Sequence, residues 1–160
     1  MSSLEVVDMK TQPHLVAAYV ALRNATRKWL LTEPVGVGET RAWLRRDDIE
    51  VCGLVEEAVL RGAVILYIQR EGEIAFFARE RGKGIGSRLL EVIEPVARRR
   101  GLRKIWAWVL EENHIARRVF ETHGYRLIGS EERKYRNTVC RGLRFEKTVA
   151  DPPPNAPCRD

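Results

Sequence analysis

The segment that most constrains the fold spans residues 73–87, where an apolar strand runs through a basic, glycine-rich loop into a helix. Three glycines alternate along the loop, at Gly82, Gly84 and Gly86, and leave main-chain N–H groups bare of side chains. The helix that follows adds unpaired N–H groups and the positive end of its dipole. The segment therefore predicts a phosphate-binding site.

The spacing excludes the two best-known phosphate loops. A Walker loop needs Ser or Thr after Gly-Lys, but Lys83 is followed by Gly84. A Rossmann fingerprint needs Gly-x-Gly-x-x-Gly, and the third glycine, Gly86, comes one position early. Close packing or a turn would also explain the glycines, so a second motif is needed to choose between these interpretations.

Apolar periodicity predicts a single α/β domain over residues 1–148, with a mixed sheet and helices on both faces. Strand 104–110 is apolar on both alternating faces, which is typical of a central strand. The proline-rich segment 149–160 is expected to be a disordered tail. The expected strands are 4–9, 49–56, 59–69, 73–78, 104–110, 125–130 and 138–147, and the expected helices are 13–27, 38–46, one from about 84, and 113–123.

Two places conflict with this pattern. Pro95 lies inside the helix that follows the glycine loop, where a proline removes a hydrogen bond and costs roughly 3 kcal/mol. We therefore expect that helix to kink or end early at Pro95, and to stop by Gly101 in any case. Strands 49–56 and 59–69 should form a hairpin, although the turn between them has no Asn-Gly or Asp-Gly.

Composition narrows the function classes. The longest apolar run, residues 63–68, is too short to span a bilayer, and the first residues lack the pattern of a secretory signal, so we expect a cytoplasmic protein with no membrane partner. Neither the three cysteines nor the three histidines show metal-ligand spacing, so no metal is expected.

The net charge of +6 fits a polyanionic cofactor, an acidic substrate, nucleic acid or a solvated face. The aromatic residues lie at apolar-periodic positions and not among the basic residues. That arrangement disfavours a nucleic-acid-binding module.

The second motif covers residues 113–125, Asn-His-Ile-Ala-Arg-Arg-Val-Phe-Glu-Thr-His-Gly-Tyr. Together with residues 81–86, Arg-Gly-Lys-Gly-Ile-Gly, it resembles the GNAT superfamily of N-acetyltransferases, whose signatures are Arg/Gln-x-x-Gly-x-Gly/Ala and Asn-x-x-Ala-x-x-x-Tyr-x-x-x-Gly-Phe. The order and separation of the two motifs match those of the superfamily, and the resemblance covers about residues 50–147. Residues 22–29 and 39–44 resemble, more loosely, the helix pair of ribosomal-protein and amino-sugar acetyltransferases.

The resemblance implies a GNAT-like, mostly antiparallel sheet in which strands 73–78 and 104–110 splay apart around acetyl-CoA as co-substrate. Main-chain groups near Phe76 would bind the pantetheine arm and polarise the thioester carbonyl, and the glycine loop would hold the pyrophosphate. The implied cofactor residues are Phe76, Phe77, Ala78, Arg81, Gly82, Lys83, Gly84, Ile85, Gly86, Ser87, Asn113, Ala116 and Phe120.

Transfer to an amine also needs a base and a proton for the thiolate. Glu73 is the first candidate for the base, because it opens the strand beside the cleft and Glu-Ile-Ala-Phe-Phe-Ala resembles the strand on which histone-type members carry a catalytic glutamate. Glu111 and Glu112, beside Asn113, are the weaker candidates. Phe120 occupies the position where the family usually has a phenol. The thiolate would then take its proton from Tyr135, Tyr125 or water. Of the two tyrosines, Tyr135 is the candidate donor, and Tyr125 is expected to lie in the core.

The sequence thus predicts acetyl transfer to a primary amine, on a protein N-terminus, a lysine or a small amino compound, by direct attack in a ternary complex. A non-catalytic acetyl-CoA sensor is the alternative, followed by the nucleic-acid module. A homodimer is left open. Trp29 and Trp43 either form a wall around the amine or, with more weight, pack the helices onto the sheet.

Overall fold

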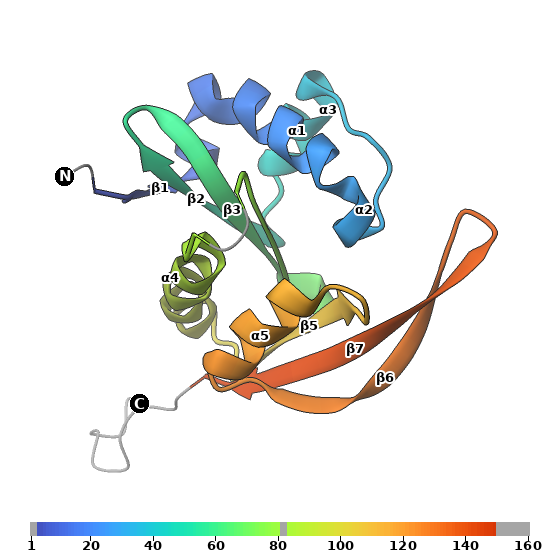
Figure 1. Cartoon of the computed structure of the whole chain (residues 1–160). Helices are drawn as coiled ribbons and strands as arrows, with labels where there is room; N and C mark the ends of the chain where they lie inside the picture. The colour runs from blue at the N-terminus through green and yellow to red at the C-terminus, as the bar shows by residue number, and fades with distance from the viewer. Residues whose placement is uncertain (1–2, 81–82, 150–160) are drawn as a thin grey trace, which may run out of the picture.

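The computed structural model describes residues 3–80 and 83–149. Within these ranges one sheet has the strand order β1-β2-β3-β4-β5-β7-β6, with helices on both faces (Figure 1). This arrangement confirms the predicted α/β fold with a mixed sheet.

The elements follow the predicted order along the chain. The first part comprises β1 (Glu5–Asp8), the 3-10 turns η1 (Met9–Thr11) and η2 (Pro13–Leu15), α1 (Val16–Ala25), α2 (Arg27–Leu30), α3 (Val37–Leu44), β2 (Ile49–Glu56), β3 (Val59–Tyr67) and η3 (Ile68–Arg70). The second part comprises β4 (Glu73–Ala78), α4 (Ile85–Arg99), β5 (Lys104–Leu110), α5 (His114–Thr122), β6 (Arg126–Tyr135) and β7 (Thr138–Thr148).

The sheet splits between β4 and β5. All neighbouring strands run antiparallel except this pair, which is parallel because α4 carries the chain back across the sheet. Within the described ranges, the only Cα partners between β4 and β5 are Glu73 and Trp106. Beyond that point the two strands separate, as the predicted splay requires.

Two apolar cores cover the opposite faces. On one face α4 and α5 bury Leu89, Ile93 and Phe120, and on the other α1 and α3 bury Tyr19 and Leu44. Alternate residues of β2, β3 and β4 point into each core in turn, as a two-residue strand period dictates. Helices therefore pack on both faces of the sheet, and this packing fixes their positions relative to the gap between β4 and β5.

The hairpin between β2 and β3 forms as predicted despite its unusual turn. Glu57 and Ala58 both take positive φ, at 50° and 64°. Two consecutive left-handed residues are what a two-residue hairpin turn requires, and Asn-Gly is only the least strained way to supply them.

Of the two outcomes expected at Pro95, a kink or an early end, the early end is wrong, because α4 continues to Arg99. Pro95 deprives the Glu91 carbonyl of its intrahelical donor, and this lost bond falls at an exposed residue of the helix. The helix stops at Gly101, as predicted. Gly101 has φ 78°, and the Leu102 N–H donates to the Ala97 carbonyl at 3.0 Å, which is a Schellman motif.

The closing hairpin is longer than predicted. β6 extends to Tyr135, five positions beyond the expected end at residue 130, and its outer part pairs with β7 alone. Val149 is buried and donates its N–H to the Arg103 carbonyl at 2.7 Å, so ordered chain passes the expected boundary at 148. The rest of the predicted tail lies outside the described residues.

No helix in the described part of the chain has both the length and the apolar character needed to cross a membrane.

Candidate active site

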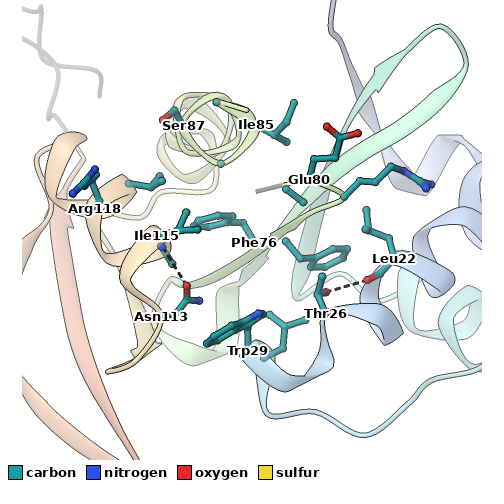
Figure 2. Close-up of a pocket in the computed structure, with 18 of the residues that line it drawn as sticks. Leu22, Thr26, Trp29, Phe76, Glu80, Ile85, Ser87, Asn113, Ile115 and Arg118 are labelled. Carbon is teal, nitrogen blue, oxygen red and sulfur yellow. Dashed lines mark hydrogen bonds between the residues drawn. The ribbon is translucent and has the colours of Figure 1, made fainter. Parts of the chain in front are cut away.

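A pocket of about 910 Å³ lies where β4 and β5 separate (Figure 2). Its lining comes from both faces of the sheet, because α4 and α5 supply one side, α1 and α2 supply the other, and the end of β4 lies between them. The lining includes residues 76–80, 84–87 and 113–116, and six residues between 21 and 30. The split in the sheet thus gives one pocket two sides.

Most of the predicted cofactor residues meet in this pocket. Those that line it are Phe76, Phe77, Ala78, Gly84, Ile85, Gly86, Ser87, Asn113 and Ala116. Lys83 and Phe120 are not part of the lining. Arg81 and Gly82 lie outside the described residues.

Part of the β4 main chain faces the gap, where the described residues provide no pairing strand beyond Glu73 and Trp106. Along a strand, these groups alternate between its two neighbours. The Arg79 N–H donates to Arg61 on β3 at 2.8 Å, whereas the Gly72 carbonyl accepts from Trp106 on β5 at 3.1 Å. The main-chain groups of Phe76 and Ala78 therefore point toward β5, which diverges from β4 at this level, while those of Phe77 point toward β3.

Phe77 thus differs from the prediction in how it contributes. Its main chain belongs to the β3 ladder, where Ala63 is its partner, and its side chain supplies the pocket wall. The expected main-chain contacts to a cofactor arm fall to Phe76 and Ala78.

The first turn of α4 presents to the same pocket main-chain amides that have no partner among the described residues. Gly84 precedes the helix with φ 77°, and the first intrahelical bond runs from the Arg88 N–H to the Gly84 carbonyl at 3.1 Å. The N–H groups of Ile85, Gly86 and Ser87 come before that bond and have no intrahelical acceptor. With the dipole of a 15-residue helix behind them, they have the arrangement that favours an anion at a helix N-terminus.

Gly86 also has a packing role. A Cβ built on it would lie 2.7 Å from Cε2 of Phe76, which is too close for two carbon atoms. Phe76 in turn rests on Phe120, with ring centroids 5.4 Å apart. Phe120 therefore supports the pocket wall from behind and does not line the slot as expected.

Tyr125 lies in the α4–α5 core, as predicted. Its ring packs edge-on against Phe120, with centroids 4.9 Å apart, and burial raises the pKa of its hydroxyl above the usual range. It does not line the pocket, so it is poorly placed to protonate a thiolate there.

Asn113 joins β5 to α5, and its side chain caps the helix by accepting from the Ala116 N–H at 3.3 Å. It is 8% exposed and faces the pocket (Figure 2). The motif residue expected to contact a cofactor arm is thus held rigidly at the pocket wall by its own helix cap.

The two tryptophans from the N-terminal helices have different positions. Trp29 lines the pocket, whereas Trp43 stacks on Tyr19 in the α1–α3 core at 6.3 Å between centroids. The structure also places Glu80 and His114 in the lining, where both are able to accept a proton. No sequence pattern had singled out these two residues.

Glu73 does not line the large pocket. It lies in a neighbouring hollow of about 400 Å³ with Arg70, Trp106 and Arg133. The residue is only 5% exposed. One carboxylate oxygen accepts from Arg70 at 3.0 Å and the other from Arg133 at 2.8 Å.

Tyr135 lies at the end of β6, also outside the pocket lining. Its hydroxyl donates to the Thr32 carbonyl at 3.0 Å, and the neighbouring Arg136 forms an ion pair with Glu33 at 2.6 Å. The hydrogen bond from Arg136 lowers the pKa of Glu33 to about 2. These contacts fasten the tip of the β6–β7 hairpin to the segment between α2 and α3.

Nowhere in residues 3–80 or 83–149 do three His, Cys, Asp or Glu side chains gather into a metal-binding group.

No curated protein sequence matches this chain closely enough to count as a relative. Solved structures share its fold. An N-acetyltransferase from Staphylococcus aureus Mu50 has 18% identity and a TM-score of 0.80, with 93% of this chain and 100% of that chain covered. The protein yncA from Salmonella typhimurium, solved with its cofactor acetyl-CoA, has 16% identity and a TM-score of 0.80, with coverages of 97% and 99%.

A third structure is an acetyl transferase from Salmonella typhimurium that modifies the N-terminal serine of a 50S ribosomal subunit protein. It has 15% identity and a TM-score of 0.73, with 92% of this chain and 96% of that chain covered. The model of the Acetyltransferase (GNAT) family matches residues 15–125, a stretch that contains the glycine loop and the whole of the second motif. The chain therefore belongs to the GNAT family of acetyltransferases.

Proposed function

We propose that this chain transfers the acetyl group of acetyl-CoA to a primary amine in a ternary complex at the β4–β5 gap. The observation that supports this most is the two-sided pocket, which gives a thioester and an amine separate approaches to one point. Holding both reactants in one site turns a bimolecular step into an effectively unimolecular one.

The cofactor would bind on the α4–α5 side. Its pyrophosphate would lie against the free amides of Ile85, Gly86 and Ser87, and its arm would follow the exposed edge of β4 past Ala78 and Phe76. A β4 N–H directed at the thioester oxygen would stabilise the negative charge that develops there during attack. The acetyl-CoA bound to yncA, which has this fold, supports the assignment.

The acceptor would enter from the α1–α2 side, past Trp29 and Leu30. Its nitrogen attacks the thioester carbon, the new C–N bond forms, the C–S bond breaks, and one proton passes from nitrogen to the departing sulfur. Glu80 and His114 line the pocket and can accept that proton. Tyr135 donates its hydroxyl hydrogen to Thr32, so water is the better candidate to protonate the thiolate.

The acceptor class is part of the proposal. A protein N-terminus carries a primary amine of the required kind, and the 50S-protein acetyl transferase that shares this fold modifies such a group. A lysine or a small amino compound presents the same chemistry. We place the reaction in the cytoplasm.

Thermal unfolding with acetyl-CoA, followed by release of CoA thiol, tests the proposal. A ligand selective for the folded state and present at a hundred times its Kd adds about 2.7 kcal/mol, which raises Tm by about 5 to 10 °C for a chain of this length. Thiol release should follow when N-terminal peptides or amines are added. A Tm shift without thiol release for any amine would favour the sensor, and no shift at millimolar acetyl-CoA would remove both.

A further inference from the structure

The two walls of the acetyl-CoA pocket belong to different halves of the sheet. β4 is paired along its length with β3, whereas α5 follows β5, which is paired along its length with β7. The described Cα pairing between these halves joins Glu73 to Trp106. The width of the pocket therefore depends on what holds the halves together at this point.

Glu73 is the centre of that connection. Its carboxylate joins Arg70, just before β4, to Arg133 on β6, at 3.0 and 2.8 Å. Burying a carboxylate is costly unless it is paired and hydrogen-bonded, and here each oxygen has a charged donor. The buried carboxylate of Glu73 thus ties β4, through the partly exposed side chain of Arg133, to a strand two places beyond β5 in the sheet.

Trp106 on β5 closes the connection. Its Nε1–H donates to the Arg70 carbonyl at 2.9 Å, and the guanidinium of Arg133 lies 5.9 Å from its ring centroid and 4.7 Å from that of Trp108. Glu73, Arg70, Trp106 and Arg133 therefore form one contiguous network at the apex of the split, referred to below as the apex joint.

The same geometry is unfavourable for a general base. A base must bring a free oxygen within hydrogen-bond reach of the proton that it removes. Both oxygens of Glu73 accept from guanidinium groups, and the side chain faces the smaller hollow and not the pocket where the reactants would meet.

We propose that Glu73 is a positioning residue that sets the separation of β4 and β5 through the apex joint, and that it is not the general base. The inference rests on the proposed function, since it concerns the width of the acetyl-CoA pocket. It also corrects the role that sequence resemblance implied for this glutamate.

The test compares Glu73→Gln, Arg133→Gln, the double variant and Arg133→Lys. Each measurement pairs the Kd for CoA, by calorimetry, with the pH profile of kcat. Because the residues act through one network, either single substitution should raise Kd by a factor within roughly 2- to 150-fold, and the double variant should raise it no further than the larger single effect. Arg133→Lys keeps a charged donor and should recover part of the affinity.

The pH profile separates positioning from base catalysis. A positioning role predicts that Glu73→Gln keeps the pH-dependent limb of kcat. A base role predicts a loss of roughly 10²- to 10⁴-fold in kcat together with that limb, an unchanged Kd, and no matching effect of Arg133→Gln. The second pattern would overturn the proposal, and so would single effects on Kd that simply multiply in the double variant.

The matched control is Glu91→Gln, which removes an exposed ion pair to Arg88 at 3.2 Å and should leave Kd unchanged. If Glu73→Gln does not fold, the Kd values of the two Arg133 variants test the apex joint instead. The Arg133 side chain is 35% exposed, so replacing it leaves no large cavity. Failure of the wild type to bind CoA would reject the proposed function and this inference together. Normal wild-type binding with unaffected variants would reject the apex joint alone.

Discussion

Replacing Gly86 by alanine adds one methyl group at the most tightly packed point of the pocket wall. The new Cβ would lie 2.7 Å from Cε2 and 3.2 Å from Cζ of Phe76. Phe76 is backed by Phe120, which stacks on Phe145 with centroids 5.7 Å apart. The ring therefore has little room to retreat into the core and is expected to tip into the pocket.

The expected size follows from two opposing terms. Overpacking a filled site costs about 1–3 kcal/mol, and alanine in a helix recovers about 0.5–1 kcal/mol relative to glycine. The net loss of up to about 2.5 kcal/mol lowers Tm by up to about 10 °C for a chain of this length. The displaced ring should also raise the KM for acetyl-CoA about tenfold, equivalent to about 1.4 kcal/mol of binding.

Gly38→Ala is a matched control, because Gly38 is also the second residue of its helix, α3, and its added methyl group would meet no neighbouring atom within 4 Å. That variant should keep the KM and raise Tm slightly. Thermal unfolding gives the Tm of both variants, and steady-state kinetics gives their KM for acetyl-CoA. If Gly86→Ala raised Tm as Gly38→Ala does and left the KM unchanged, the packing account of the pocket wall would be refuted.

Three further predictions concern other parts of the fold. Gly142→Ala drives a Cβ into the Trp108 ring, so thermal unfolding should show Tm about 3 to 10 °C lower, and an unchanged Tm would contradict this packing. Burial raises the pKa of Cys52 to about 11, so iodoacetamide at pH 8 should label it about a hundredfold more slowly in folded than in unfolded protein, and equal rates would refute its burial. The Arg136 hydrogen bond lowers the pKa of Glu33 to about 2, so the contact between Arg136 and Glu33 should persist through the ordinary glutamate pKa and weaken only as pH falls toward 2. An NMR titration of the Glu33 carboxyl with a midpoint near 4 would show that the pair is open in solution.

Local signals in the sequence were sufficient for the elements that flank the pocket. The start of α4 after the glycine loop and its stop before Gly101 follow from a cap at each end, as do the bounds of α5 between Asn113 and Gly124. Only the passage of α4 through Pro95 differs from the expectation. The alternation of β4 fixed which side chains face each core. These features depend on residues that are close in sequence, which is why pattern reasoning could find them.

Features that depend on distant partners could not be predicted in this way. Glu73 and Arg133 are 60 positions apart, and neither residue type reveals the other. α4 continues through Pro95 at a point where the preceding turn, at Glu91, is exposed, and that exposure is determined only by how the helix packs. The sequence left two roles open for Trp29, and the choice between them required the positions of α1 and α2 relative to the split.

The central claim is that acetyl-CoA occupies the β4–β5 gap with its pyrophosphate at the start of α4. A crystal structure of the protein soaked with CoA tests it most directly. The account predicts phosphate oxygens within hydrogen-bond distance of the Ile85, Gly86 and Ser87 amides and the pantetheine arm along Phe76. An empty gap, or CoA bound on another face of the sheet, would contradict it.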